Sequence, residues 1–130
     1  MRAAYLDTSF LLAILFDETG AAGLRRTLGR YERVFSSDLL TAETLSAAVR
    51  ERLEVGAVMT TLEAVALVLP HRSLDRELRD VLALGYLRGA DAWHVACALF
   101  LAGSARSELA FLSRDVAQRR AARRLGFATP

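Results

Sequence analysis

Four acidic side chains stand at the ends of apolar segments, where they could act together chemically. They are Asp7, Glu43, Asp91 and Asp115. Two carboxylates about 4 Å apart repel each other by about 4 kcal/mol at an effective dielectric constant near 20. If the four meet, some of them must take up protons, or a divalent cation must lie among them.

A cluster of carboxylates with no cysteine and no obligatory histidine is typical of Mg²⁺ or Mn²⁺ binding. Such an ion can turn a bound water into a nucleophile and stabilise the charge that grows on a phosphate. Each acid alone also has a structural explanation. Asp7 suits a turn or a helix cap, Glu43 a solvated helix surface, and Asp91 and Asp115 suit helix N-caps.

The elements that must position these acids alternate between strands and helices. The clearest strands are continuously apolar, which is typical of a parallel sheet covered on both faces. We expect clear strands at 3–6, 33–36 and 109–112 and weaker ones at 71–74 and 127–129. We expect helices at 10–16, 21–31, 38–52 with Gly56 after its end, 57–69, 76–87, 91–101 and 116–125. The pattern predicts one α/β domain spanning residues 1–130.

Sites in open parallel sheets lie beyond the carboxyl ends of the strands. Asp7 directly follows the first strand, and Asp115 follows the 109–112 strand with one serine-arginine pair between. If those strands are neighbours, both carboxylates overhang one crevice. Glu43 and Asp91 can reach the same crevice from the first turns of their helices.

The composition excludes several other functions. Apolar residues make up 53% of the chain, the net charge is only +2, and all 17 basic residues are arginine. Without lysine there can be neither a P-loop nor a lysine Schiff base. The one cysteine, Cys97, lies among apolar residues and is expected to be a buried thiol in a reducing cytoplasm. The longest apolar run, 95–102, is too short to span a membrane. Asp7 interrupts the apolar run at the N-terminus, so we expect no signal peptide.

Four segments in order resemble the signatures of PIN-domain nucleases. They are Asp7-Thr8-Ser9 after an apolar strand, Ser37 to Glu43, Arg88-Gly89-Ala90-Asp91-Ala92 with Ala96, and Phe111-Leu112-Ser113-Arg114-Asp115. The resemblance covers nearly the whole chain, and its length and motif details are most similar to VapC-type toxins of toxin–antitoxin pairs.

The resemblance implies a three-layer α/β/α fold with a five-stranded parallel sheet of strand order 3-2-1-4-5. It implies Mg²⁺- or Mn²⁺-dependent cleavage of RNA in the cytoplasm, a cognate antitoxin that blocks the site, and a homodimer. By motif match, Asp7, Glu43, Asp91 and Asp115 would be the catalytic metal-binding acids, and Ser9 and Ser113 would support them. Ser113 stands where the family often has threonine, which keeps the hydroxyl group.

Other residues have weaker claims to a role. His94 can share a helix face with Asp91, as a catalytic base or ligand or as a structural histidine near the rim. The last predicted helix is rich in arginine, which is either a solvated face or a track for the RNA backbone that includes Arg114 and Arg119.

Three other functions are compatible with an acidic pocket in an α/β domain. A catalytically silent partner would keep the fold and only bind an antitoxin-like peptide or RNA, but the presence of all four acids argues against it. Haloacid-dehalogenase-like phosphatases have a second aspartate where this chain has Ser9, and response-regulator receivers need a pocket lysine, which this chain lacks.

Overall fold

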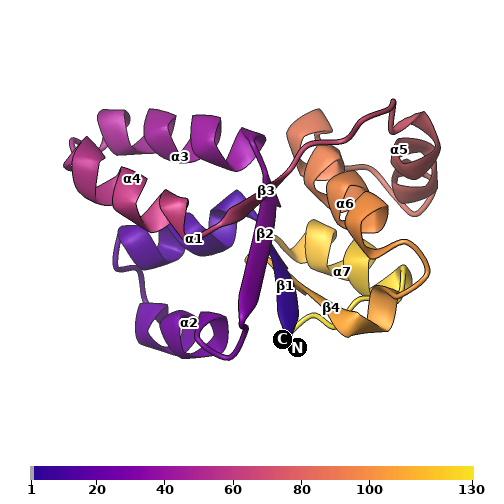
Figure 1. The fold of residues 1–130 in the computed structure, drawn as a ribbon, viewed down its shortest axis with the longest axis horizontal. Helices are drawn as coiled ribbons and strands as arrows, with labels where there is room; N and C mark the ends of the chain where they lie inside the picture. The colour runs from indigo at the N-terminus through magenta and orange to yellow at the C-terminus, as the bar shows by residue number, and fades with distance from the viewer. Residues whose placement is uncertain (1) are drawn as a thin grey trace.

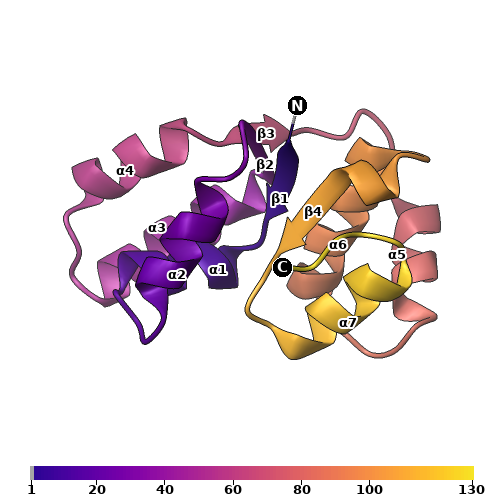
Figure 2. The ribbon, with the colours of Figure 1, turned by 90° about the horizontal axis from the view of Figure 1, so that it is seen from below.

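The computed structural model describes residues 2–130 and has a central parallel sheet between two layers of helices (Figures 1 and 2). In chain order the elements are β1 (Ala3–Leu6), α1 (Thr8–Leu15), α2 (Ala21–Leu28), β2 (Arg33–Ser37), α3 (Leu39–Arg50), α4 (Val55–Glu63), β3 (Ala66–Val68), α5 (Asp75–Leu82), α6 (Gly89–Ala102), the short 3₁₀ helix η1 (Arg106–Glu108), β4 (Leu109–Leu112) and α7 (Val116–Arg124). The α/β class and the parallel sheet predicted from the sequence are therefore confirmed.

The sheet has four strands in the order β3-β2-β1-β4, so the expectation of five strands is wrong within residues 2–130. The segment 127–129 makes only an isolated parallel bridge, in which Ala128 lies opposite Ala110. The Phe111 N–H donates to the Ala128 carbonyl at 2.8 Å. Pro130 has no N–H with which to extend this pairing into a ladder.

The third strand lies in a segment that we had expected to be helical. The sequence 57–69 divides into α4 and the strand β3, which pairs with β2 through Phe35 and Ala66. Val68 is β-branched and suits a pleated strand. The expected strand at 71–74 is a loop instead. Gly56 does not end α3 but lies inside α4, where the Glu54 carboxylate accepts its N–H at 2.9 Å.

Alternating strand residues divide the core into two clusters, one on each face of the sheet. Tyr5, Leu109 and Phe111 pack under α5, α6 and α7, whereas Ala4, Leu6, Ala110 and Leu112 pack under α1 to α4. Figures 1 and 2 show these two sets of helices on opposite sides of the strands. This alternation follows from the two-residue period of a strand.

β1 and β4 are parallel neighbours from Ala3 opposite Leu109 to Leu6 opposite Leu112. The Asp7 N–H extends this pairing by donating to the Leu112 carbonyl at 2.9 Å. The residues that follow the two strands are therefore held side by side at the carboxyl end of the sheet.

Candidate metal centre

The four acids singled out from the sequence line one cleft at the carboxyl end of the sheet. The cleft has a volume of about 610 Å³, and its walls include Asp7, Glu43, Asp91 and Asp115. Asp7 and Asp115 follow the adjacent strands β1 and β4, and Glu43 and Asp91 project from the beginnings of α3 and α6. The structure thus brings the four together as the strand order required.

Asp7 is held in place from several directions. Its side chain is nearly inaccessible to solvent, and its Oδ2 atom accepts the Ser9 N–H at 3.0 Å and thereby caps α1. The Ser9 hydroxyl also donates to Oδ2, and the Ser113 hydroxyl lies 3.3 Å from it. Ser9 and Ser113 therefore lie where support of the acid cluster would place them.

Gln118 is a buried residue of the site that the sequence reasoning missed. Its Nε2 atom donates to Asp7 Oδ1 at 3.0 Å and to the Asp91 carbonyl at 3.1 Å, and its Oε1 accepts the Ser113 hydroxyl at 2.7 Å. Its own N–H donates to Asp115 Oδ1 at 2.8 Å. One amide side chain thus connects the backbone of α6 with the residues that follow β1 and β4. The three-residue spacing from a capping aspartate to a glutamine was the available signal.

Glu43 is held by a second hydrogen-bond network, which includes the buried side chain of His94. The His94 Nε2 atom lies 2.8 Å from Glu43 Oε1, and the Thr8 hydroxyl donates to the same oxygen at 2.7 Å. His94 is only 1% exposed. Burial of the Glu43 carboxylate opposes its ionisation, but hydrogen bonds from His94 and Thr8 outweigh this and lower its pKa.

The tautomer of His94 follows from the partner on its other nitrogen. The Ser37 N–H donates to the Tyr5 hydroxyl at 3.1 Å, and this hydroxyl lies 2.9 Å from His94 Nδ1. The Tyr5 hydroxyl can then donate to Nδ1, which leaves the proton of a neutral ring on Nε2, facing Glu43. Burial raises the pKa of Tyr5 well above its ordinary value, so its hydroxyl keeps its proton. In this arrangement His94 links Glu43 to Tyr5.

Asp91 lies in the first turn of α6 and is paired with Arg88. The Arg88 Nε atom donates to Asp91 Oδ2 at 3.2 Å. Burial raises the pKa of Asp91, and the charges of Asp115 and Asp7 raise it further against the lowering effect of Arg88. Asp115 and Asp7 therefore disfavour the ionised form of Asp91.

The two arginines proposed from the sequence lie in different surroundings. Arg114 is exposed and lines a second hollow that continues from the acid cleft through Ser9 and Asp115. Arg119 is half-buried, and its guanidinium donates to the carbonyls of Ser113 at 3.5 Å and Thr129 at 3.2 Å. Only Arg114 therefore has its side chain in a hollow that joins the acids.

The donor set of the cleft fits a hard divalent cation, because it consists of carboxylate oxygens whose charges repel. Within residues 2–130, no three histidine, cysteine or acidic side chains stand close enough together to bind one ion as they are placed. Glu43 is drawn toward His94, and Asp91 toward Arg88. The carboxylates are therefore the right ligands for such an ion, but in this structure they are hydrogen-bonded to other protein groups and do not converge on one point.

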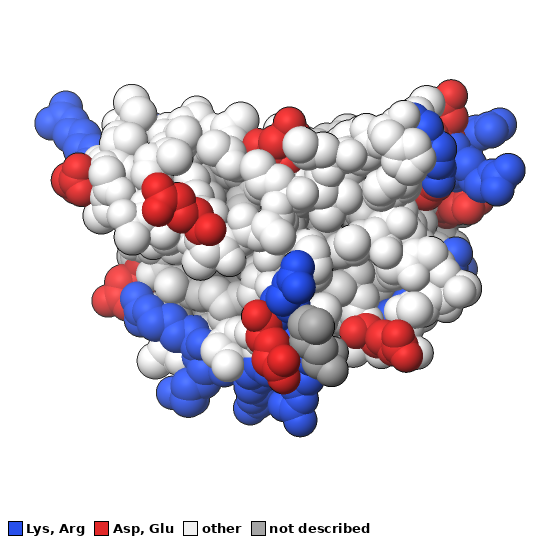
Figure 3. Space-filling view, in the orientation of Figure 1, with Lys and Arg blue, Asp and Glu red and all other residues white. Residues whose placement is uncertain are grey.

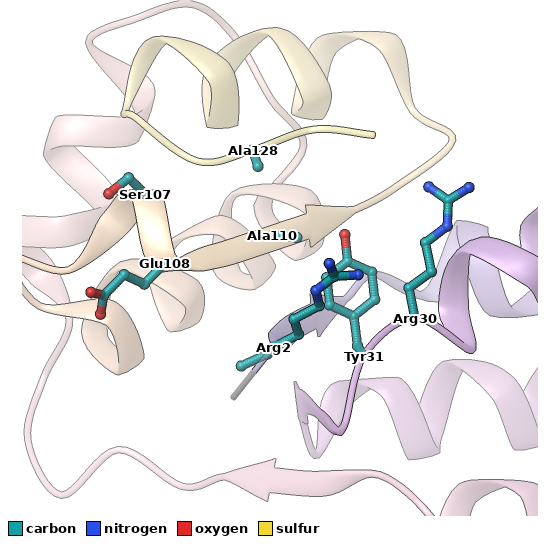
Figure 4. A pocket seen from close by; sticks show the side chains of 8 residues that line it. Arg2, Arg30, Tyr31, Ser107, Glu108, Ala110 and Ala128 are labelled. Atoms are coloured by element: carbon teal, nitrogen blue, oxygen red, sulfur yellow. The ribbon is translucent and has the colours of Figure 1, made fainter.

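Another hollow lies at the opposite end of the sheet. It has a volume of about 530 Å³ and is lined by residues at or just before the starts of β1, β2 and β4. Figure 4 shows Arg2, Arg30 and Tyr31 on one side of it and Ser107 and Glu108 on the other. Because it contains one acid and lies away from the carboxyl ends of the strands, it does not share the chemistry of the acid cleft.

The face over which β3 runs in Figure 1 is largely uncharged in its middle, and charged side chains gather along its lower edge and flanks (Figure 3). Leu67 and Leu69, in and just after β3, are 45% and 67% exposed. In the described part of the chain, no helix is long and apolar enough to cross a bilayer.

Comparison with protein families gives one match. The model of the family described as the PIN domain matches residues 4–124. No curated protein and no solved structure matches the chain. The matched range contains Asp7, Glu43, Asp91 and Asp115, as well as Gln118 and His94.

Proposed function

Because this chain belongs to the PIN domain family, whose members are generally metal-dependent nucleases, we propose that it is a metal-dependent endoribonuclease. The observation that carries the proposal is the meeting of Asp7, Glu43, Asp91 and Asp115 in one cleft at the carboxyl end of the sheet. The carboxyl group of Asp91, raised in pKa by burial and by the neighbouring Asp115 and Asp7, is costly to ionise without a cation. The meeting of acids from distant parts of the chain in one cleft is therefore better explained by function than by folding.

The four acids would hold Mg²⁺ or Mn²⁺, which supplies a water activated for attack and a positive charge beside the phosphate that is cleaved. The protein groups around them have separate tasks. Ser9, Ser113 and Gln118 fix the Asp7 carboxylate, and His94 and Thr8 fix Glu43. The pairing with Arg88 reduces the free energy cost of an ionised Asp91 until a cation is bound.

Arg114, of the two arginines predicted from the sequence, is the one placed to contact the RNA backbone in this proposal. Its side chain lines the hollow next to the acids, which themselves repel phosphate. We expect Arg114→Ala to weaken RNA binding and to reduce its salt dependence. An unchanged affinity and salt slope would remove Arg114 from the substrate path. Arg119 stays a second candidate, to be tested in the same way.

The finer assignment is a toxin of the VapC type that acts in the cytoplasm, forms a homodimer and is inhibited by a cognate antitoxin. This assignment is supported by the four motifs quoted from the sequence. The exposed Leu67 and Leu69 beside an uncharged face offer an apolar surface for a protein contact. Co-expression with the product of the adjacent reading frame, followed by co-purification and a growth assay, tests it.

The nuclease proposal is tested with purified protein on structured RNA in Mg²⁺ or Mn²⁺, with EDTA as the metal-free control. We expect Asp7→Asn and Asp91→Asn to abolish cleavage and Asp80→Asn, an exposed acid on α5, to leave it unchanged. Equal activity in all four proteins would mean a contaminating nuclease. RNA or antitoxin binding without cleavage by the wild type would favour the alternative, a catalytically silent partner.

A further inference from the structure

The acid cleft continues into a further groove that is not lined by Arg114. Asp91 and Asp115 also line a hollow of about 330 Å³ whose other walls include Tyr86, Leu87 and Arg88. Tyr86 and Leu87 then line a smaller hollow that reaches Arg120 and Arg124 on α7. The shared residues make one continuous path from the acids to these arginines.

Tyr86 has an unusual position on this path. It lies in the loop between α5 and α6 and is 84% exposed, the highest value among the large apolar side chains at the surface of residues 2–130. Aromatic rings normally gain stability by burial. An aromatic face that remains in water beside a carboxylate cleft is available for a ligand.

The loop that carries Tyr86 is anchored on both sides of the ring. Leu87 is buried in the core, and the Arg124 guanidinium donates to the Leu84 carbonyl at 3.2 Å. Gly85, just before Tyr86, has a φ of +151°, a conformation that favours glycine. The ring is therefore displayed by a fixed turn and does not depend on a mobile segment.

Two arginines supply charge along the groove. Arg88 is exposed at its entrance from the acids, and Arg120 is exposed on α7 beside Tyr86. An aromatic face followed by a guanidinium is the pairing that holds an unpaired nucleotide, because the base stacks on the ring and the arginine contacts the phosphate. A base in a duplex cannot offer its face in this way.

We propose that Tyr86 is a stacking platform for an unpaired base next to the cleaved phosphate, and that Arg120 contacts the backbone of the same strand. This inference rests on the proposed nuclease function and adds a specificity-determining residue to it. It requires the RNA to be single-stranded on the Tyr86 side of the cut.

The test measures binding in EDTA, so that it does not depend on cleavage or on a bound metal ion. Fluorescence anisotropy with a labelled single-stranded RNA is compared with the same sequence in a duplex. We expect Tyr86→Ala to weaken single-strand binding by about tenfold, Tyr86→Phe to keep it, and duplex binding to be unaffected by either change. Because Tyr86 packs against so little protein, its variants should fold as the wild type does, which circular dichroism checks.

The arginine has its own test and control. Arg120→Ala should reduce the slope of log affinity against log salt by about 0.7, the value for one contact to a single strand. Arg26→Ala, an exposed arginine of α2 remote from the groove, should leave the slope unchanged. Wild-type affinity for Tyr86→Ala, or an equal loss on duplex RNA, would overturn the platform. A wild-type protein that neither binds nor cleaves RNA would instead overturn the nuclease proposal on which it rests.

Discussion

Replacing Gln118 by leucine removes the amide that links the acids of the cleft, while the side chain keeps a similar volume. Three hydrogen bonds are lost, to Asp7 Oδ1, to the Asp91 carbonyl and from the Ser113 hydroxyl. We expect this variant to be destabilised and to hold Asp7 less firmly, because Gln118 is fully buried and no water can replace its amide.

The size of the effect follows from what each partner can do afterwards. Asp7 is 3% exposed, so Oδ1 would lose its donor without gaining a water, which costs about 1–3 kcal/mol. The Ser113 hydroxyl can turn toward Asp7 Oδ2, 3.3 Å away, so its loss is partial. The Asp91 carbonyl is a backbone acceptor of α6 and loses only this additional donor. The sum is about 2–4 kcal/mol, or a fall in Tm of about 8–16 °C for a domain of this size.

Urea unfolding followed by circular dichroism measures this loss in metal-free buffer. Thr44→Val is the matched control, because Thr44 is also fully buried but its hydroxyl has no hydrogen-bond partner among residues 2–130. We expect that change to leave stability unaltered or to raise it by about 1 kcal/mol. A loss below about 1 kcal/mol for Gln118→Leu would refute the view that this amide holds the cluster together.

Three further substitutions test the electrostatics of the site. Burial and the neighbouring carboxylates raise the pKa of Asp91 in the folded state, so ionisation of Asp91 lowers the stability of the fold as pH rises. In metal-free buffer, Asp91→Asn should therefore have a higher Tm than the wild type at pH 7. This difference in Tm should shrink as the pH is lowered. For Glu43, hydrogen bonding outweighs burial and lowers the pKa of the carboxyl group. The ionised side chain therefore stabilises the fold at neutral pH, and this stabilisation is lost as pH falls through the folded pKa. Glu43→Gln should lower the free energy of unfolding in urea by about 1 kcal/mol at pH 7 and by less near pH 4. Tyr5→Phe should cost about 2 kcal/mol in the same assay, since it leaves the Ser37 N–H and His94 Nδ1 without their partner. An Asp91→Asn protein that melts below the wild type, or a Glu43→Gln protein whose deficit does not vary with pH, would contradict these assignments.

The prediction that the four acids meet needed two neighbouring strands and the direction of two helices, and the neighbourhood of the two strands came from the family resemblance. Continuously apolar strands predicted the parallel sheet, and the position of Asp7 and Asp115 just after β1 and β4 predicted their side. The helix boundaries were less accurate, because caps compete locally: α1 begins at Thr8, two residues before the expected start, with Asp7 as its cap.

The sequence could not show which neutral residues hold those acids. Gln118 and Tyr5 each have a hydrogen-bond partner that is distant in the chain, Asp7 for Gln118 and His94 for Tyr5, and only the three-dimensional pairing reveals it. The strand β3 was missed for a related reason. Its residues fit a helix pattern as well as a strand, and pairing with β2 decided between the two.

The acid cleft straddles the two layers of the fold. Asp7 and Glu43 belong to the side built by α1 and α3, whereas Asp91 and Asp115 belong to the side built by α6 and α7. Neither layer can assemble the cluster alone, so any ion that binds all four carboxylates would link the two layers and stabilise their packing. Loosening of either layer would disperse the charges before most of the backbone hydrogen bonds are lost, and activity should therefore disappear earlier in a denaturant titration than helical structure does.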